Sequence, residues 1–130
     1  GVVKAVLKIN FFGDNLPTLN LDINQIKSVI NNLALNAADA MTEGGHLSII
    51  TRFNESTQSV TIEFTDTGHG IPEENLTKIF DPFFSTKQTG KGTGLGLSVT
   101  YGIIKRHNGT ITVKSTIGKG TTFTITLPVA

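Results

Sequence analysis

The stretch SVTIEFTDTGHGIP, residues 59–72, decides the fold because it shows which face of a strand is buried and where the strand ends. Val60, Ile62 and Phe64 alternate with polar residues, which is the period of a strand with one buried face. Asp66 continues this apolar row, and two glycines separated by one residue follow it. A carboxylate in a low-dielectric interior costs several kcal/mol unless it is paired or neutralised. We therefore expect a protein donor or a ligand at Asp66, and the alternative is an aspartate that only forms the turn.

The size and composition of the chain limit what it can be. Its 130 residues, 38% of them hydrophobic, suffice for one domain with one core. The formal net charge is +1 and the lysines are scattered, so no basic stripe favours nucleic acid as a partner. The absence of cysteine excludes disulfides and thiolate metal sites. Because no apolar run approaches the roughly 20 residues that span a bilayer, and no signal-peptide pattern opens the chain, we expect a soluble domain, whether complete or cut from a longer protein.

Hydrophobic periodicity predicts the other elements. Strands are expected at residues 3–11, 46–53, 59–66, 110–115 and 121–128. Helices are expected at residues 23–41, 72–80 and 95–107, and a turn with a short extended segment at 13–22. Because the strands form hairpins and do not alternate strictly with helices, the predicted fold class is α+β. It is a two-layer α/β sandwich in which helices pack on one face of a mixed, mostly antiparallel sheet.

Sequence signals also mark the ends of the two longer helices. Asp22 with Gln25 forms a capping-box pattern before the first helix, and the glycines at 44–45 end it. The Asn-Gly pair at 108–109 ends the last helix, where His107 is expected to interact with the negative end of the helix dipole.

The long helix carries a polar stripe beside its apolar face. Asn32, Asn36 and Asp39 are four and three residues apart, so their side chains share one side of the helix. One interpretation is a set of solvated residues at the edge of the buried face. The other is a ligand for a hard cation, because Mg²⁺ prefers oxygen and often takes a single protein ligand beside substrate phosphates, a role that the Asn36 amide can fill.

Residues 81–96, DPFFSTKQTGKGTGLG, have no hydrophobic period and predict a mobile loop. The pattern matches neither the Walker phosphate loop nor the dinucleotide glycine motif. Its glycines allow a ligand to approach the backbone, and the loop leads into a helix N-terminus, which favours phosphate. Lys87 and Lys91 would add positive charge there. A flexible hinge with solvated lysines is the alternative.

The three histidines, His46, His69 and His107, are expected in a strand, in the glycine turn and at a helix end. This distribution forms no metal set, and none has an acid at a spacing typical of a catalytic base.

Four motifs in chain order together resemble a known family. They are NNLALNAADAM at 31–41, DTGHG at 66–70, IFDPFFSTK at 79–87 and GTGLGL at 92–97. This series resembles the ATP-binding catalytic domain of bacterial sensor histidine kinases, in the superfamily of gyrase, heat-shock chaperones, histidine kinases and mismatch-repair ATPases. The resemblance covers nearly the whole chain, 1–130, and the PFFSTK form is most similar to the nitrogen-regulation type of sensor kinase.

The resemblance implies a site for ATP and Mg²⁺. The first motif is similar to the N box, with Asn36 as the Mg²⁺ ligand, and in the second Asp66 would accept a hydrogen bond from the adenine amine. The phenylalanine-rich motif and the last glycine motif flank a lid at approximately 80–96, in which Lys87 is a candidate phosphate contact with a tentative catalytic role. Thr121, in the closing strand pair GKGTTFTITLP, would reach towards adenine. The implied ATP-binding residues are Asn32, Asn36, Asp39, Asp66, Gly68, Gly70, Ile71, Lys87, Gly92, Thr93, Gly94, Leu95, Gly96, Leu97 and Thr121.

Two positions of the helical motif differ from relatives. The hydrolases of the superfamily carry a glutamate four residues before the metal-binding asparagine, and here that residue is Asn32, whose amide cannot be a general base. This favours phosphoryl transfer over hydrolysis. Asp39 stands where relatives have a basic or amide residue.

The function implied is donation of the γ-phosphoryl group of ATP to a histidine on a separate dimerisation domain of the same kinase, with a response regulator downstream. The isolated domain is expected to be a cytoplasmic monomer, whether or not the full-length protein is membrane-anchored, and no nucleic acid partner is expected. The alternatives are a non-catalytic nucleotide-binding module, a superfamily ATPase or a serine protein kinase.

Overall fold

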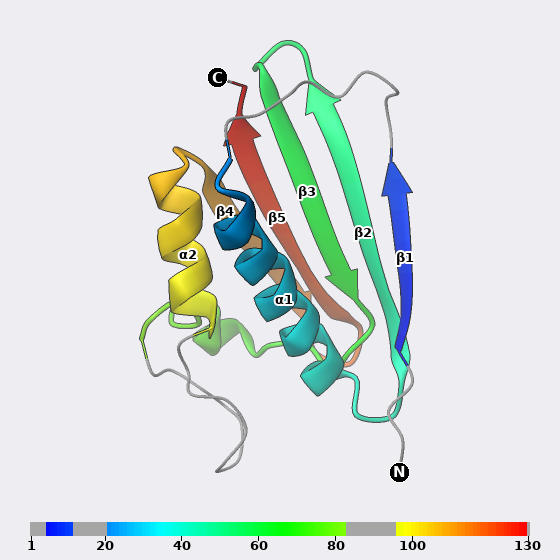
Figure 1. Cartoon of the computed structure of the whole chain (residues 1–130). Helices are drawn as coiled ribbons and strands as arrows, with labels where there is room; N and C mark the ends of the chain where they lie inside the picture. The colour runs from blue at the N-terminus through cyan, green and yellow to red at the C-terminus, as the bar shows by residue number, and fades with distance from the viewer. Residues whose placement is uncertain (1–4, 12–20, 83–95, 130) are drawn as a thin grey trace.

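The domain has two layers, a five-stranded sheet and two α-helices that lie across one of its faces (Figure 1). The computed structural model describes residues 5–11, 21–82 and 96–129. The strands are β1 (Ala5–Phe11), β2 (Gly45–Asn54), β3 (Ser59–Asp66), β4 (Thr110–Thr116) and β5 (Gly120–Pro128). The helices are α1 (Ile23–Ala40), the short 3₁₀-helix η1 (Glu73–Asn75) and α2 (Gly96–Arg106). This architecture confirms the predicted α+β sandwich.

The sheet is mixed and mostly antiparallel, as predicted, with the strand order β1-β2-β3-β5-β4. Both hairpins expected from the sequence form, β2 with β3 and β4 with β5. β1 pairs in parallel with β2 at one edge. The pairing of β3 with β5 joins the two hairpins, and its register sets Asp66 opposite Thr121. Two strand ends that are far apart in the sequence therefore lie side by side.

The core lies between the helices and one face of the sheet. Every second residue of β5 is buried, and Phe64 of β3 lies directly opposite Phe123. This alternation follows the predicted period of the strands. The buried hydrophobic residues are Val29, Leu33, Ala37, Met41, Leu47, Ile49, Val60, Phe64, Ile79, Ile103, Ile104, Ile111, Phe123, Ile125 and Leu127.

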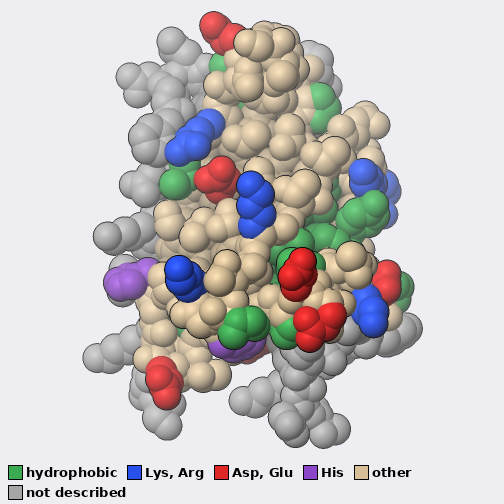
Figure 2. All heavy atoms as spheres, turned by 180° about the vertical axis from the view of Figure 1, so that it is seen from behind, with side chains coloured by type: hydrophobic (Ala, Val, Ile, Leu, Met, Phe, Trp, Pro, Cys, Tyr) green, Lys and Arg blue, Asp and Glu red, His purple; other side chains and the backbone are tan. Residues whose placement is uncertain are grey.

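The other face of the sheet is polar and rich in threonine. Its cross-strand neighbours include Thr61 with Thr126 and Thr65 with Thr122. Threonine is β-branched and favours strands, so these side chains support the sheet without adding to the core. Figure 2 shows this face, with lysine, arginine and acidic side chains scattered among uncharged polar ones. No helix of the described ranges covers it (Figure 1).

α1 packs on the sheet through one stripe of side chains. Val29, Leu33, Ala37 and Met41 recur every four residues and are all buried. Ile30 is 40% exposed, because one step along a helix turns the side chain by about 100° away from Val29. The sequence also located the start of the helix correctly, since Asp22 caps it by accepting a hydrogen bond from the Gln25 N–H at 3.1 Å.

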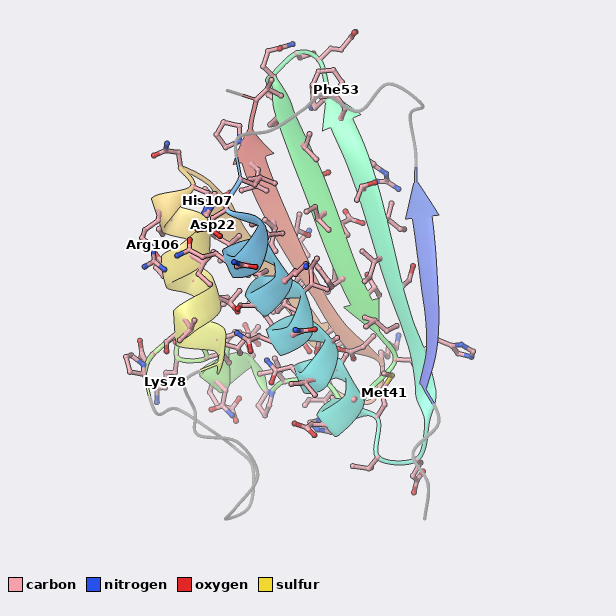
Figure 3. All side chains as sticks on the ribbon, in the orientation of Figure 1. Asp22, Met41, Phe53, Lys78, Arg106 and His107 are labelled. Atoms are coloured by element: carbon pink, nitrogen blue, oxygen red, sulfur yellow. The ribbon has the colours of Figure 1, made fainter. Side chains whose placement is uncertain are left out.

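α2 ends where the sequence predicted, and its last turn is tied to the start of α1. Asn108 has a φ of 61°, the left-handed conformation that terminates helices. The imidazole of His107 donates from Nδ1 to the Ile103 carbonyl at 2.8 Å, and its Nε2 accepts the backbone N–H of Asp22 at 3.1 Å. Figure 3 shows Asp22 and His107 side by side at this end of the helical layer. His107 therefore caps α2 through a hydrogen bond and also links the two helices.

Residues 72–80 do not form the expected α-helix. Only Glu73–Asn75 form a 3₁₀-helix, and turns continue to Phe80. The backbone bonds here span three residues, as from the Lys78 N–H to the Asn75 carbonyl at 2.9 Å. Asparagine and threonine at 75 and 77 are weak helix formers, and burial of Ile79 holds the segment against the core.

Two sequence predictions lie mostly outside the described residues. They are the turn and extended segment at 13–22, of which only 21 and 22 are described, and the loop at 81–96. Within the described residues, no helix is both long and apolar enough to cross a membrane.

We expect Leu33→Ala to lower the free energy of unfolding by about 3 kcal/mol, because Leu33 is 2% exposed and its removal leaves a cavity under α1. Leu35→Ala is the matched control, since Leu35 is 64% exposed on the same helix and its loss should cost less than about 0.5 kcal/mol. Urea denaturation measures both. Equal losses in the two variants would contradict this account of the core.

Candidate functional site

Three segments that the sequence singled out meet around α1. The loop after β3 packs against the C-terminal end of α1, while the first turn of α2 contacts α1 at Asn32. The turn between β4 and β5 closes over the same loop, because the Gly118 N–H donates to the His69 carbonyl at 2.8 Å. α1 is thus the element on which the other parts of the candidate site are assembled.

Asp66 is a carboxylate on the buried face, as its place in the strand predicted. It is 5% exposed, and its Oδ1 accepts the Gly68 N–H at 2.8 Å. Burial raises the pKa of Asp66, while the backbone N–H groups of Gly68 and Thr121 and the nearby His69 oppose that rise. The bond to Gly68 is that of a turn-forming aspartate, so the turn interpretation is correct in part. It does not account for the burial of the charge, which leaves a ligand as a second partner to consider.

The glycines after Asp66 are required by close packing. A Cβ on Gly68 would lie 2.6 Å from the Ala40 carbonyl oxygen at the end of α1. Gly70 has a φ of +81°, and a Cβ there would collide with the carbonyl oxygen of Thr116. The loop is therefore held between α1 and the β4–β5 turn, which fixes the position of the Asp66 carboxylate.

Thr121 lies opposite Asp66 and is also 5% exposed. Its hydroxyl is 2.8 Å from the hydroxyl of Ser115 in β4. Ser115 also accepts the Ile71 N–H at 2.7 Å and donates to the Gly120 carbonyl at 3.0 Å. One serine thus connects the loop after β3 with the strand that carries Thr121.

Asn32 connects α1 with the beginning of α2. Its Nδ2 donates to the carbonyl of Gly96 at 3.2 Å and to the Thr100 hydroxyl at 3.3 Å. Thr100 is fully buried, so this bond also satisfies a hydroxyl inside the helical layer. The N-terminal end of α2 is consequently fixed against the asparagine-bearing side of α1.

The other predicted site residues of the described ranges have less specific surroundings. Asn36 is half-buried on α1, Asp39 is exposed, and both interact with other groups of the protein. Ile71 and Leu97 are partly buried and pack against the core. No group of three or more His, Asp or Glu side chains within the described ranges could hold a metal ion by itself.

Part of the predicted site lies outside the described residues, namely Lys87, Gly92, Thr93, Gly94 and Leu95. The beginning of the phenylalanine-rich motif is described. The ring of Phe80 packs at a tilt against Tyr101 of α2, with ring centroids 5.5 Å apart, and edge-on against Phe123 of the core at 6.3 Å. The beginning of the expected lid is thereby anchored to both layers.

Sequence reasoning missed two hydroxyl residues of the site, Ser115 and Thr100. The strand period gave a signal for Ser115, because it continues the inward row of Ile111 and Val113. Thr100 lies on the buried side of α2, with Ile103 and Ile104 in the next turn, where a hydroxyl needs a partner.

Comparison with known protein families identifies the family of this chain. A family model described as histidine kinase-, DNA gyrase B- and HSP90-like ATPase matches residues 21–130. The chain belongs to this ATPase family. This confirms the resemblance inferred from the four sequence motifs.

Proteins similar to this ATPase domain include sensor kinases. It is 47% identical to the sensor kinase CckA of Brucella abortus over 135 residues, which covers 94% of this chain and 14% of that protein. The catalytic domain of the histidine kinase ThkA has the same fold, with a TM-score of 0.81 and 34% identity over 95% of this chain and 78% of that one. Full-length ShkA in complex with AMPPNP gives a TM-score of 0.81 at 25% identity, over 98% of this chain and 26% of that one.

These similarities identify an ATPase domain of the histidine kinase type and support a role in two-component signalling. The family binds ATP. The chain spans 14% of the length of CckA and 26% of ShkA, so the activity of a whole kinase belongs to the proposal below.

We expect Asp66→Asn to raise the free energy of unfolding near neutral pH, because it removes a buried charge and keeps an oxygen for the Gly68 N–H. The raised pKa means that the folded wild type binds a proton more readily than the unfolded chain. Wild-type stability should therefore rise as the pH falls from the raised value towards 3.8, the ordinary value for aspartate, and the advantage of the variant should shrink over that window. Urea denaturation at a series of pH values measures this, and an advantage independent of pH would contradict it.

Proposed function

We propose that this ATPase domain binds Mg-ATP and donates the γ-phosphoryl group to a histidine on the dimerisation domain of a sensor kinase. The observation that carries the proposal is the position of two groups along α1. The Asp66 loop packs at Ala40 and the first turn of α2 contacts Asn32, eight residues away, which corresponds to roughly 12 Å along a helix. This spacing suits an extended nucleoside triphosphate, with its base at one end and its phosphates at the other.

The base would bind at the Asp66 end. A buried carboxylate beside a buried threonine hydroxyl offers acceptors in apolar surroundings, which matches the exocyclic amine of adenine. Gly68, Gly70 and the backbone of Ile71 would complete this part of the site. The complex of ShkA with AMPPNP, an analogue of ATP, supports the choice of nucleotide.

The phosphates would bind at the α2 end. The first N–H groups of a helix have no partner within it and favour anions, and Gly96 begins α2. Gly92, Thr93, Gly94, Leu95 and Lys87 would add backbone donors and positive charge there, and Leu97 a backbone N–H. Asn36 lies between the two ends on α1, and its amide oxygen has the chemistry to hold Mg²⁺, which neutralises phosphate charge when bound. Asp39 lies one turn further along α1, and it would contact the nucleotide only through that ion or through water.

The side chain of Asn32 favours phosphoryl transfer over hydrolysis of ATP. Its amide nitrogen donates to Gly96 and Thr100 of α2, and an amide has no basic group with which to activate water. Catalysis would then consist of positioning the triphosphate and neutralising its charge, while the nucleophile comes from another domain. The downstream acceptor would be a response regulator.

Calorimetric titration of Mg-ATP into the domain tests the binding part. The wild type should bind, and Asp66→Asn should weaken binding by about tenfold to a hundredfold, because a hydrogen bond to a charged acceptor is lost. Asp22→Asn is the matched control: it makes the same change at the cap of α1, where asparagine caps equally well, and should leave affinity unchanged. If Asp66→Asn bound Mg-ATP as tightly as the wild type, the proposal that adenine binds at Asp66 would be wrong.

Phosphotransfer is tested by adding a separately purified histidine-bearing dimerisation domain of a related sensor kinase, together with γ-labelled ATP. We expect acid-labile label on that histidine and little free phosphate, and no label on the ATPase domain alone. Tight ATP binding with no label on any histidine would instead indicate a non-catalytic nucleotide-binding module, and rapid release of free phosphate would indicate a hydrolase.

A further inference from the structure

The hydroxyl of Ser115 uses its full hydrogen-bonding capacity. It lies 2.7 Å from the Ile71 nitrogen, 3.0 Å from the Gly120 carbonyl oxygen and 2.8 Å from the Thr121 hydroxyl. A serine hydroxyl has one proton to donate and two lone pairs with which to accept. Three partners therefore account for all of its sites.

The chemistry of the partners decides the direction of each bond. The Ile71 N–H can only donate and the Gly120 carbonyl can only accept, so the serine proton is directed to Gly120. The contact between Ser115 and Thr121 then requires that the Thr121 hydroxyl be the donor. With its proton used in this bond, Thr121 has only lone pairs left for any other partner.

Thr121 and Asp66 face the same side of the sheet. They are direct cross-strand neighbours, and each is 5% exposed. An ionised carboxylate is also only an acceptor. The pair therefore presents acceptors alone, and a group bound between them has to donate.

We infer that Ser115 is a positioning residue that fixes the Thr121 hydroxyl as an acceptor and thereby makes the site select a purine with an amino group at C6 over one with a carbonyl there. This inference rests on the proposed function, since it assumes that the purine binds at Asp66. With the C6 substituent between Thr121 and Asp66, a 6-oxo group would place an oxygen against two acceptors, and the N1–H that a 6-oxopurine also carries would lie beside the pair. Unpaired buried polar groups of this kind give strong discrimination. Without Ser115, the Thr121 proton is free to turn towards a carbonyl.

The inference is tested by the ratio of ATP to ITP affinity, measured by calorimetry, because ITP differs from ATP only in its base, where a 6-oxo group and an N1–H replace the 6-amino group and the unprotonated N1. We expect the wild type to prefer ATP strongly and Ser115→Ala to lower the ratio about tenfold, the value of one hydrogen bond. Thr121→Val should lower it similarly. Thr122→Val is the matched control, since this neighbouring hydroxyl bonds Thr65 at 3.1 Å on the opposite face, and it should leave the ratio unchanged.

A double variant separates positioning from a general structural effect. If Ser115 acts through Thr121, adding Ser115→Ala to Thr121→Val should not change the ratio further. Ser115→Cys keeps the size of the side chain and weakens its hydrogen bonds, so it repeats the test with less disturbance of the fold.

The outcomes distinguish the inference from the proposed function. A wild type that binds neither nucleotide overturns both. A wild type that prefers ATP, with a ratio unchanged in Ser115→Ala and Ser115→Cys or lowered additively in the double variant, overturns the role of Ser115 and leaves the proposed function intact.

Discussion

The packing of one apolar stripe of α1 on the sheet is the constraint on which the rest of the structure depends. The helix is held against the strands by Val29, Leu33, Ala37 and Met41. Other residues of the same helix contact the segments that form the candidate site. Its C-terminal end touches the loop after β3, and Asn32 receives the start of α2. Core and site are therefore two sides of one element, so a change that shifts the helix displaces both ends of the candidate site together.

The burial of the Asp66 carboxylate has a cost in stability. An apolar residue at the end of this row would fit the strand pattern and avoid the burial of a charge, yet the chain holds a carboxylate there and supports it with the backbone of Gly68 and Thr121. The supporting loop also excludes side chains at two glycine positions. Such a departure from local folding rules is common where a protein binds a ligand, which is the role proposed for Asp66.

The sequence predicted those features that depend on local pattern. The alternation up to Phe64 gave both the strand and the burial of Asp66, and Asp22 marked the start of α1. The bonds of Ser115 and Thr100 could not be predicted, because they depend on strand register and on the angle between two helices. The prediction of a helix at residues 72–80 was wrong, because packing of Ile79 in the core is more favourable here than a regular series of helical hydrogen bonds.

The bond between His107 and Asp22 has a mechanical consequence. The backbone N–H of Asp22 is the point at which the chain enters α1, and the imidazole that holds it is itself attached to the last turn of α2. A pull on the chain at this point therefore loads both helices at once, at the end of the helical layer opposite to the one where α2 begins (Figure 3). The two helices would then move together, and the contact of Asn32 with Gly96 lies at the other end of α2.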